Sequence, residues 1–120
     1  MKALLDRNIL IDYLNGIKAA RSEIDRYAPA LISSITWMEV MVGAVPEEET
    51  IVRGFLKRFS VVPIDDEICE TAVRIRRSRR IKLPDAIVWA SAQINDALLV
   101  SRNSHDFPVD HPSVRIPYQV

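Results

Sequence analysis

Short apolar runs alternate along the chain with stretches in which apolar residues recur three or four positions apart. The runs predict buried strands, and the stretches with helical spacing predict helices between them. The expected strands cover residues 3–5, 30–33, 61–64, 97–101 and, in a proline-rich tail, 114–116. The expected helices cover residues 9–14, 17–27, 34–43, 46–58, 65–75 and 84–94. Strands that alternate with helices predict an α/β fold, a three-layer α/β/α sandwich with a central, mostly parallel sheet.

Individual residues sharpen several of these boundaries. Pro63 places the third strand at an edge of the sheet, because proline donates no ladder hydrogen bond. Ser34 or Thr36 opens the next helix after the second strand, and Thr36 with Glu39 matches a capping box. Asp65 is expected to cap a helix, and Pro84 to begin one.

Composition limits the class of protein. The chain of 120 residues has the length of one domain, which we expect to span residues 1–120. One cysteine, Cys69, excludes an intrachain disulfide and a cysteine-based metal site. His105 and His111 are expected to be solvated rather than a zinc pair. No apolar run has the length of a membrane span, and Asp6 and Arg7 interrupt any secretory pattern, so a cytoplasmic protein without membrane contact is expected.

Charge gives no global argument for nucleic acid, since 16 basic and 16 acidic residues balance. The basic residues are nevertheless concentrated between residues 74 and 82, a segment without acids. This basic block comprises Arg74, Arg76, Arg77, Arg79, Arg80 and Lys82. It is either a solvated helix end or a surface for RNA phosphates.

Asp6 stands where the first strand ends and a helix begins. In parallel α/β sheets, ligands bind at the carboxyl ends of strands. A helix cap is the structural alternative for Asp6 or for Asn8.

Three further acids occupy comparable places. Glu39 follows the second strand, Asp85 opens the helix before the fourth strand, and Asp106 follows that strand. Each has a structural alternative: Glu39 as part of a capping box, Asp85 at a helix N-terminus, and Asp106 as the brace of a turn. Glu39 and Asp85 lie in apolar stretches, where a carboxylate is costly unless it is compensated. A divalent cation would compensate several such groups, and oxygen-only ligands favour Mg²⁺ or Mn²⁺ over zinc.

Four segments together resemble a known family. They are LLDRNILIDYL at residues 4–14, SSITWMEV at 33–40, LPDAIV at 83–88, and LVSRN at 99–103 followed by Asp106-Phe107. In this order they are similar to the PIN-domain ribonucleases, and closely to the VapC-type toxins of bacterial toxin–antitoxin systems.

The resemblance implies a metal-dependent endoribonuclease that cleaves RNA phosphodiester bonds. It implies Asp6, Glu39 and Asp85 as catalytic residues and as ligands of Mg²⁺ or Mn²⁺. The fourth catalytic position falls on Asn103 or Asp106, with Asn8 in support. In the basic block, the expected RNA-binding residues are Arg76, Arg79, Arg80 and Lys82.

Partners follow from the same resemblance. A VapB-type antitoxin is expected to inhibit the enzyme, and a homodimer or a larger toxin–antitoxin complex on DNA through the antitoxin is expected. An apolar groove for an antitoxin segment is predicted near Trp37, Met38 and Met41.

One position departs from the family pattern. A small hydroxyl residue usually follows the first aspartate, where this chain has Arg7. A guanidinium beside a cation site favours the alternative of a catalytically weakened or inactive PIN-like binding module. A phosphoacceptor receiver domain is rejected, because its aspartate after the third strand and its later lysine are missing.

Overall fold

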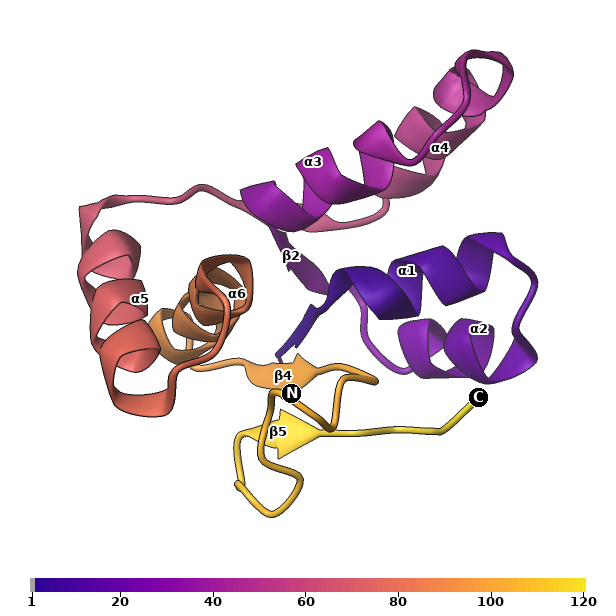
Figure 1. Cartoon of the computed structure of the whole chain (residues 1–120). Coiled ribbons are helices and arrows are strands. Elements are labelled where there is room, and N and C mark those ends of the chain that lie inside the picture. Colours follow the sequence, from indigo (N-terminus) through magenta and orange to yellow (C-terminus); the bar gives the residue numbers. More distant parts are fainter. Residues whose placement is uncertain (1) are drawn as a thin grey trace.

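A parallel sheet forms the centre of the protein in a computed structural model that describes residues 2–120 (Figure 1). Its strand order is β3-β2-β1-β4-β5, and every pairing is parallel. The strands are β1 (Ala3–Leu5), β2 (Leu31–Ser33), β3 (Ser60–Val62), β4 (Leu98–Val100) and β5 (Val114–Arg115). The α/β sandwich expected from the sequence is thereby confirmed.

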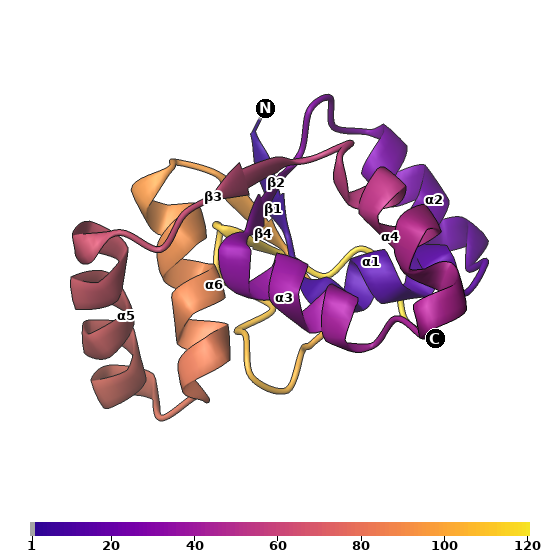
Figure 2. The same cartoon turned by 90° about the horizontal axis from the view of Figure 1, so that it is seen from above.

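Helices cover both faces of the sheet. They are α1 (Arg7–Leu14), α2 (Lys18–Asp25), α3 (Ser34–Val42), α4 (Glu49–Leu56), α5 (Asp66–Arg79) and α6 (Leu83–Ile94). Successive residues of β1 point to opposite faces, so Leu4 packs with the cluster under α5 and α6, and Leu5 with the cluster under α1, α2 and α4. Seen from above, α3 lies between α6 and α1 (Figure 2).

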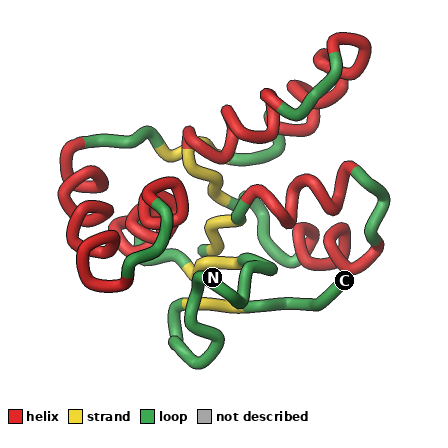
Figure 3. The backbone as a smooth tube through the Cα atoms, in the orientation of Figure 1, coloured by secondary structure: helices red, strands yellow, loops and turns green. Residues whose placement is uncertain are grey.

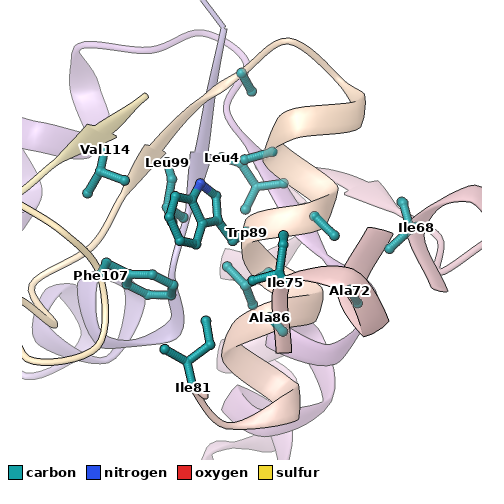
Figure 4. Close-up of a cluster of buried hydrophobic side chains, with 14 of the residues drawn as sticks. Leu4, Ile68, Ala72, Ile75, Ile81, Ala86, Trp89, Leu99, Phe107 and Val114 are labelled. Carbon is teal, nitrogen blue, oxygen red and sulfur yellow. The ribbon is translucent and has the colours of Figure 1, made fainter. Parts of the chain in front are cut away.

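Trp89 is the largest fully buried side chain and fills the α5–α6 side of the core (Figure 4). Its ring meets Phe107 edge-on at 5.8 Å between centroids, and His111 in the same manner at 5.4 Å. The contact with Phe107 holds the loop between β4 and β5 against α6. His111 is therefore packed against the core rather than free in solvent, and it lies apart from His105.

Helix α3 begins at Ser34, one of the two starts expected from the sequence, but its cap differs from the prediction, and so does the start of α4. Ser33 caps α3 by accepting a hydrogen bond from the Ile35 backbone N–H at 3.3 Å. The predicted capping box of Thr36 and Glu39 is wrong, because the cap lies three residues earlier, and the buried Thr36 hydroxyl has no hydrogen-bond partner among residues 2–120. The segment that begins at Pro46 is first a 3₁₀ turn, Pro46–Glu48, and becomes α-helical only from Glu49.

Other local predictions are confirmed. β3 is an edge strand and ends at Val62, directly before Pro63. Asp65 caps α5, and Pro84 lies in the first turn of α6. Within residues 2–120, no helix combines the length and apolarity that crossing a bilayer requires.

The cap of α5 gives a test of these local rules. The Asp65 side chain accepts a hydrogen bond from the Ile68 backbone N–H at 2.9 Å. Asp65→Ala should lower the free energy of unfolding by about 1 kcal/mol, measured by urea denaturation. The control Asp66→Ala removes an exposed acid of the first helical turn and should cost at most about half as much. Equal effects of the two variants would contradict the capping role.

Candidate active site

Four acidic side chains from separate parts of the chain surround one cleft at the carboxyl ends of the strands. Asp6 follows β1, Glu39 lies on α3 after β2, Asp85 lies in the first turn of α6, and Asp106 lies in the loop after β4. The cleft has a volume of about 530 Å³. Its lining comprises Asp6, Arg7, Asn8, Glu39, Lys82, Pro84, Asp85, Arg102, Asn103, Ser104, His105 and Asp106.

Asp6 forms the floor of the cleft and is only 4% exposed. Its carboxylate accepts hydrogen bonds from the Arg7 backbone N–H at 2.8 Å and from the Ser101 hydroxyl at 2.7 Å. Asn8 donates a longer hydrogen bond of 3.4 Å to the same group. Burial raises the pKa of Asp6, and the Ser101 and Arg7 contacts oppose that rise. Asp6 is therefore both the cap of α1 and a member of the acidic group, so the two sequence-based interpretations hold together.

Asp85 shows the strongest effect of crowding among these acids. Burial raises its pKa first, and the charges of Asp6 and Asp106 raise it further, to about 6. Lys82 opposes the rise without cancelling it. The cleft thus holds more negative charge than its own cations neutralise.

Glu39 is partly neutralised by its neighbour across the cleft. A guanidinium nitrogen of Arg7 lies 3.5 Å from a Glu39 carboxylate oxygen. Burial raises the pKa of Glu39, Arg7 lowers it and Asp6 raises it. The side chain of Arg7 is 55% exposed, so this ion pair is weak. Arg7 therefore faces the acidic group and does not turn away into solvent.

The loop after β4 supplies the fourth acidic position (Figure 3). The Asn103 side-chain amide donates to an Asp106 carboxylate oxygen at 2.9 Å, and the Asp106 backbone N–H donates to the Asn103 side-chain oxygen at 3.2 Å. This exchange closes a turn, so Asp106 does brace a turn, as one sequence-based alternative predicted. Both residues line the cleft, and both alternatives for the fourth position stay open.

The carboxylates do not close around a single point. In the part of the chain from Lys2 onward, no three Asp, Glu, His or Cys side chains lie close enough together to hold one metal ion. The ion pair between Glu39 and Arg7 is one physical reason, because it orients that carboxylate towards a guanidinium. The charges of Asp6 and Asp106 raise the pKa of Asp85, and Lys82 opposes that rise only in part.

The basic block lies beside the cleft and reaches it at one position. Lys82 lines the cleft, whereas Arg76, Arg79 and Arg80 are exposed on and after α5 and do not line it. The guanidinium of Arg79 lies over the Trp89 ring, 4.7 Å from its centroid. The Arg79 guanidinium therefore makes a cation–π contact within the protein.

Three residues in or next to the cleft were given no role in the site from the sequence, and one of them, Ser101, is fully buried and does not line the cleft. The Ser101 hydroxyl binds Asp6, the Arg102 backbone N–H donates to the Asn8 side chain at 3.1 Å, and His105 lines the rim. The position of Ser101 directly after a buried strand was the available signal. Nothing in the local pattern indicated the roles of Arg102 and His105.

Of the residues near which an apolar groove was predicted, Trp37 and Met38 do line an apolar hollow, and Met41 does not. Trp37 and Met38 line a small apolar hollow with Ser34 and Val61 at the sheet edge. A larger groove of about 290 Å³ lies between α1, α3 and α4. It is lined mainly by apolar side chains, among them Ile11, Leu14, Val40, Ile51 and Val52.

Comparisons with known proteins agree with this architecture. The chain is similar to a protein in the structure "Toxin-antitoxin complex from Klebsiella pneumoniae", with 42% identity, a TM-score of 0.93, and coverage of 98% of this chain and 99% of that one. It is 32% identical over 114 residues to Ribonuclease VapC10 of Mycobacterium tuberculosis, which covers 88% of this chain and 86% of that protein. It also shares its fold with a chain of the DNA-bound VapBC from Salmonella typhimurium, at 24% identity, 96% coverage of both chains and a TM-score of 0.79.

The model of the PIN domain matches residues 3–109, a span that contains all four acidic positions of the cleft. Together with the parallel sheet and the place of these acids at its carboxyl edge, this match identifies the chain as a member of the PIN domain family.

Proposed function

We propose that the protein is a divalent-metal-dependent endoribonuclease toxin restrained by a cognate antitoxin. The observation that carries the proposal is the cleft in which burial, and then the charges of Asp6 and Asp106, raise the pKa of Asp85 to about 6. Such excess negative charge is typical of a site that functions with a bound cation. The similarity to Ribonuclease VapC10 supports RNA as the substrate.

The donor set fits Mg²⁺ or Mn²⁺ in chemistry. Carboxylate oxygens are hard ligands, and the cleft lining includes no cysteine. We propose Asp6 and Asp85 as ligands, with Asp106 or Asn103 at the fourth position. Glu39 joins them as the third acidic ligand when Arg7 releases it. A bound divalent cation would supply an activated water molecule and stabilise negative charge on the phosphate.

The protein's own groups prepare the site. Ser101 and Asn8 hold Asp6 in one orientation through hydrogen bonds of 2.7 and 3.4 Å. Asp6, Glu39 and Asp85 are the acidic residues of the proposed catalytic centre. Asp106, held by Asn103, presents its carboxylate to the cleft from the loop after β4.

RNA is proposed to lie between the acidic cleft and the basic block. Lys82 at the rim would contact a phosphate next to the scissile bond. Arg76 and Arg80 on the exposed side of the block would contact phosphates further along the strand, and Arg79 would do so while stacked on Trp89.

The proposed partner is a VapB-type antitoxin, as in the toxin–antitoxin complexes of similar fold. The groove between α1, α3 and α4 supports this proposal, because Ile51 is 70% exposed and Leu14 is 38% exposed there. An apolar helix of the antitoxin would cover these side chains. We further propose a homodimer, a DNA-bound complex formed through the antitoxin, a cytoplasmic location and a single PIN-like domain over residues 1–120.

A second candidate is a PIN-like binding module with weakened or absent turnover. The ion pair between Arg7 and Glu39 favours it, because a guanidinium already occupies part of the space between the carboxylates. The two candidates differ in whether purified protein cleaves RNA when Mg²⁺ or Mn²⁺ is added.

The first prediction concerns this activity. Asp6→Asn and Asp85→Asn should each lower the rate of RNA cleavage about a hundredfold or more, because each removes charge that stabilises the reacting centre. The measurement is cleavage of a labelled RNA by purified protein with Mg²⁺ and with Mn²⁺. The control Asp110→Asn removes an exposed acid that does not line the cleft and should leave the rate unchanged. Parent protein that cleaves no RNA with either ion would favour the binding module.

The second prediction uses the pKa of Asp85. Because this pKa is about 6 in the folded protein and 3.8 for an unperturbed aspartate, folding favours the protonated form. Asp85 therefore contributes stability at acidic pH, and this contribution is lost as the pH rises through about 6. In metal-free buffer, Asp85→Asn should be more stable than the parent at pH 7 by about 1 kcal/mol after allowance for solvent screening.

Thermal unfolding at several pH values checks this linkage. The advantage of Asp85→Asn should disappear near pH 4. Added Mg²⁺ should raise the Tm of the parent more than that of the variant. A parent and a variant with equal Tm values at pH 7 in metal-free buffer would contradict the electrostatic account of the cleft.

The third prediction concerns Arg7. Arg7→Thr removes a cation that competes for Glu39 and should tighten Mn²⁺ binding roughly fivefold, the equivalent of about 1 kcal/mol for a partly exposed charge pair. RNA cleavage should rise with it. Arg7→Lys keeps the positive charge and should resemble the parent, and Asp6→Ala added to Arg7→Thr should abolish the gain. Calorimetric titration with Mn²⁺ measures the affinity. An unchanged affinity in Arg7→Thr would show that Arg7 does not influence metal binding.

A further inference from the structure

A second ionic network adjoins the cleft but does not belong to its acidic group. Asp12 on α1 has a side chain only 8% exposed. It accepts two hydrogen bonds from the Arg102 guanidinium, at 2.8 and 3.2 Å, and one from the Tyr118 hydroxyl at 2.8 Å. Asp12 does not line the cleft, and its charge balances that of Arg102. The three residues are separated by up to 106 positions in sequence, so the network joins α1, the loop after β4 and the C-terminal segment.

Helix α1 holds residue 102 at two points. Asn8 and Asp12 are four positions apart and therefore share one face of the helix. The Asn8 side chain accepts from the Arg102 backbone N–H, and the Asp12 carboxylate accepts from the Arg102 side chain. Because both backbone and side chain are fixed, the loop cannot shift along α1 without breaking a charge-assisted pair.

The residues on either side of Arg102, Ser101 and Asn103, contact the acidic residues of the cleft. Ser101, on one side, donates to Asp6 and accepts from the Asn103 backbone N–H at 3.0 Å. Asn103, on the other side, exchanges hydrogen bonds with Asp106. Fixing residue 102 therefore fixes both the hydroxyl that orients Asp6 and the amide that orients Asp106.

The C-terminal segment completes this arrangement. After β5 it runs past α1 and α2 to the end of the chain (Figure 1). It is held at its start by Arg115, which makes two hydrogen bonds to the buried Glu23 of α2, at 2.7 and 3.0 Å. Tyr118 then places its hydroxyl on Asp12. Without this donor, one oxygen of a largely buried carboxylate would keep only the Arg102 contact.

We propose that Asp12, Arg102 and Tyr118 form a positioning brace through which the C-terminal segment fixes the loop of residues 101–106 in the cleft. This proposal rests on the proposed ribonuclease activity for its catalytic consequence, but not for the brace itself. The three residues are positioning residues, since they act through Asn103 and Asp106 and do not contact the reacting atoms. Loss of the brace should lower turnover and leave RNA binding largely unchanged, because small displacements of catalytic groups reduce rates strongly.

The test replaces a single hydroxyl. Tyr118→Phe keeps the ring and removes the hydrogen bond to Asp12. Tyr27→Phe is a matched control, because the Tyr27 hydroxyl donates in the same way to Glu23 at 2.9 Å but lies away from the cleft. Hydrogen exchange followed by NMR reports the backbone amides of Asn103 and Asp106, with the Val88 amide in α6 as the reference for global opening.

Tyr118→Phe should speed exchange at Asn103 and Asp106 roughly fivefold, with exchange at Val88 unchanged, and Tyr27→Phe should leave all three amides unchanged. With RNA as substrate, Tyr118→Phe should lower kcat roughly fivefold while KM changes by less than about twofold. Equal exchange rates at Asn103 and Asp106 in Tyr118→Phe and Tyr27→Phe would overturn the proposed brace. A local rise in exchange with unchanged kcat overturns its catalytic role. If the parent cleaves no RNA, the proposed function fails and the exchange comparison alone decides on the brace.

Discussion

The burial of the Asp6 carboxylate is the constraint on which the rest of the site depends. A charged group that is 4% exposed is costly, and two short hydrogen bonds, from Arg7 N–H and the Ser101 hydroxyl, only partly offset that cost. Those donors come from the start of α1 and the end of β4, two segments that meet because β1 and β4 are parallel neighbours. The sheet order therefore explains why the floor of the cleft is built from residues 95 positions apart.

The same burial explains the charge balance of the cleft. Asp6 cannot turn to solvent, so its charge acts on Asp85 and raises the pKa of that carboxyl together with Asp106. Glu39 meets the same repulsion but has Arg7 beside it. Among the acidic residues of the cleft, Glu39 is therefore the one that forms an ion pair with a cation of the cleft, in the part of the chain that the structure describes. The metal ion proposed for the cleft would compete with the Arg7 guanidinium for Glu39, which would link the identity of residue 7 to metal affinity.

Much of the fold could be predicted from the sequence because its signals are local. The apolar run at residues 3–5, the cap at Asp65 and the proline in the first turn of α6 act within a few residues, and each was interpreted correctly. The cap of α3 was misjudged because Ser33 and Thr36 both carry a hydroxyl that can cap a helix, and only the backbone conformation distinguishes them. Ser33 is extended there, with a ψ angle of 152°. Sequence spacing cannot show such a difference.

The acidic group could be predicted because each member follows a strand or opens a helix, whereas its supporting contacts could not. Arg102 pairs with Asp12 across 90 positions, and no pattern of spacing predicts that choice among 16 basic residues. The pairing is decided by burial: Asp12 lies on the inner side of α1, and an unpaired charge there would be costly. Arg102 lines the acidic cleft yet is neutralised by Asp12, so it adds little positive charge to the site. Arg102 is thus paired with an acid outside the cleft lining, whereas Arg7 is paired with Glu39 inside it, and Arg7 is therefore the arginine that would compete with the proposed metal ion.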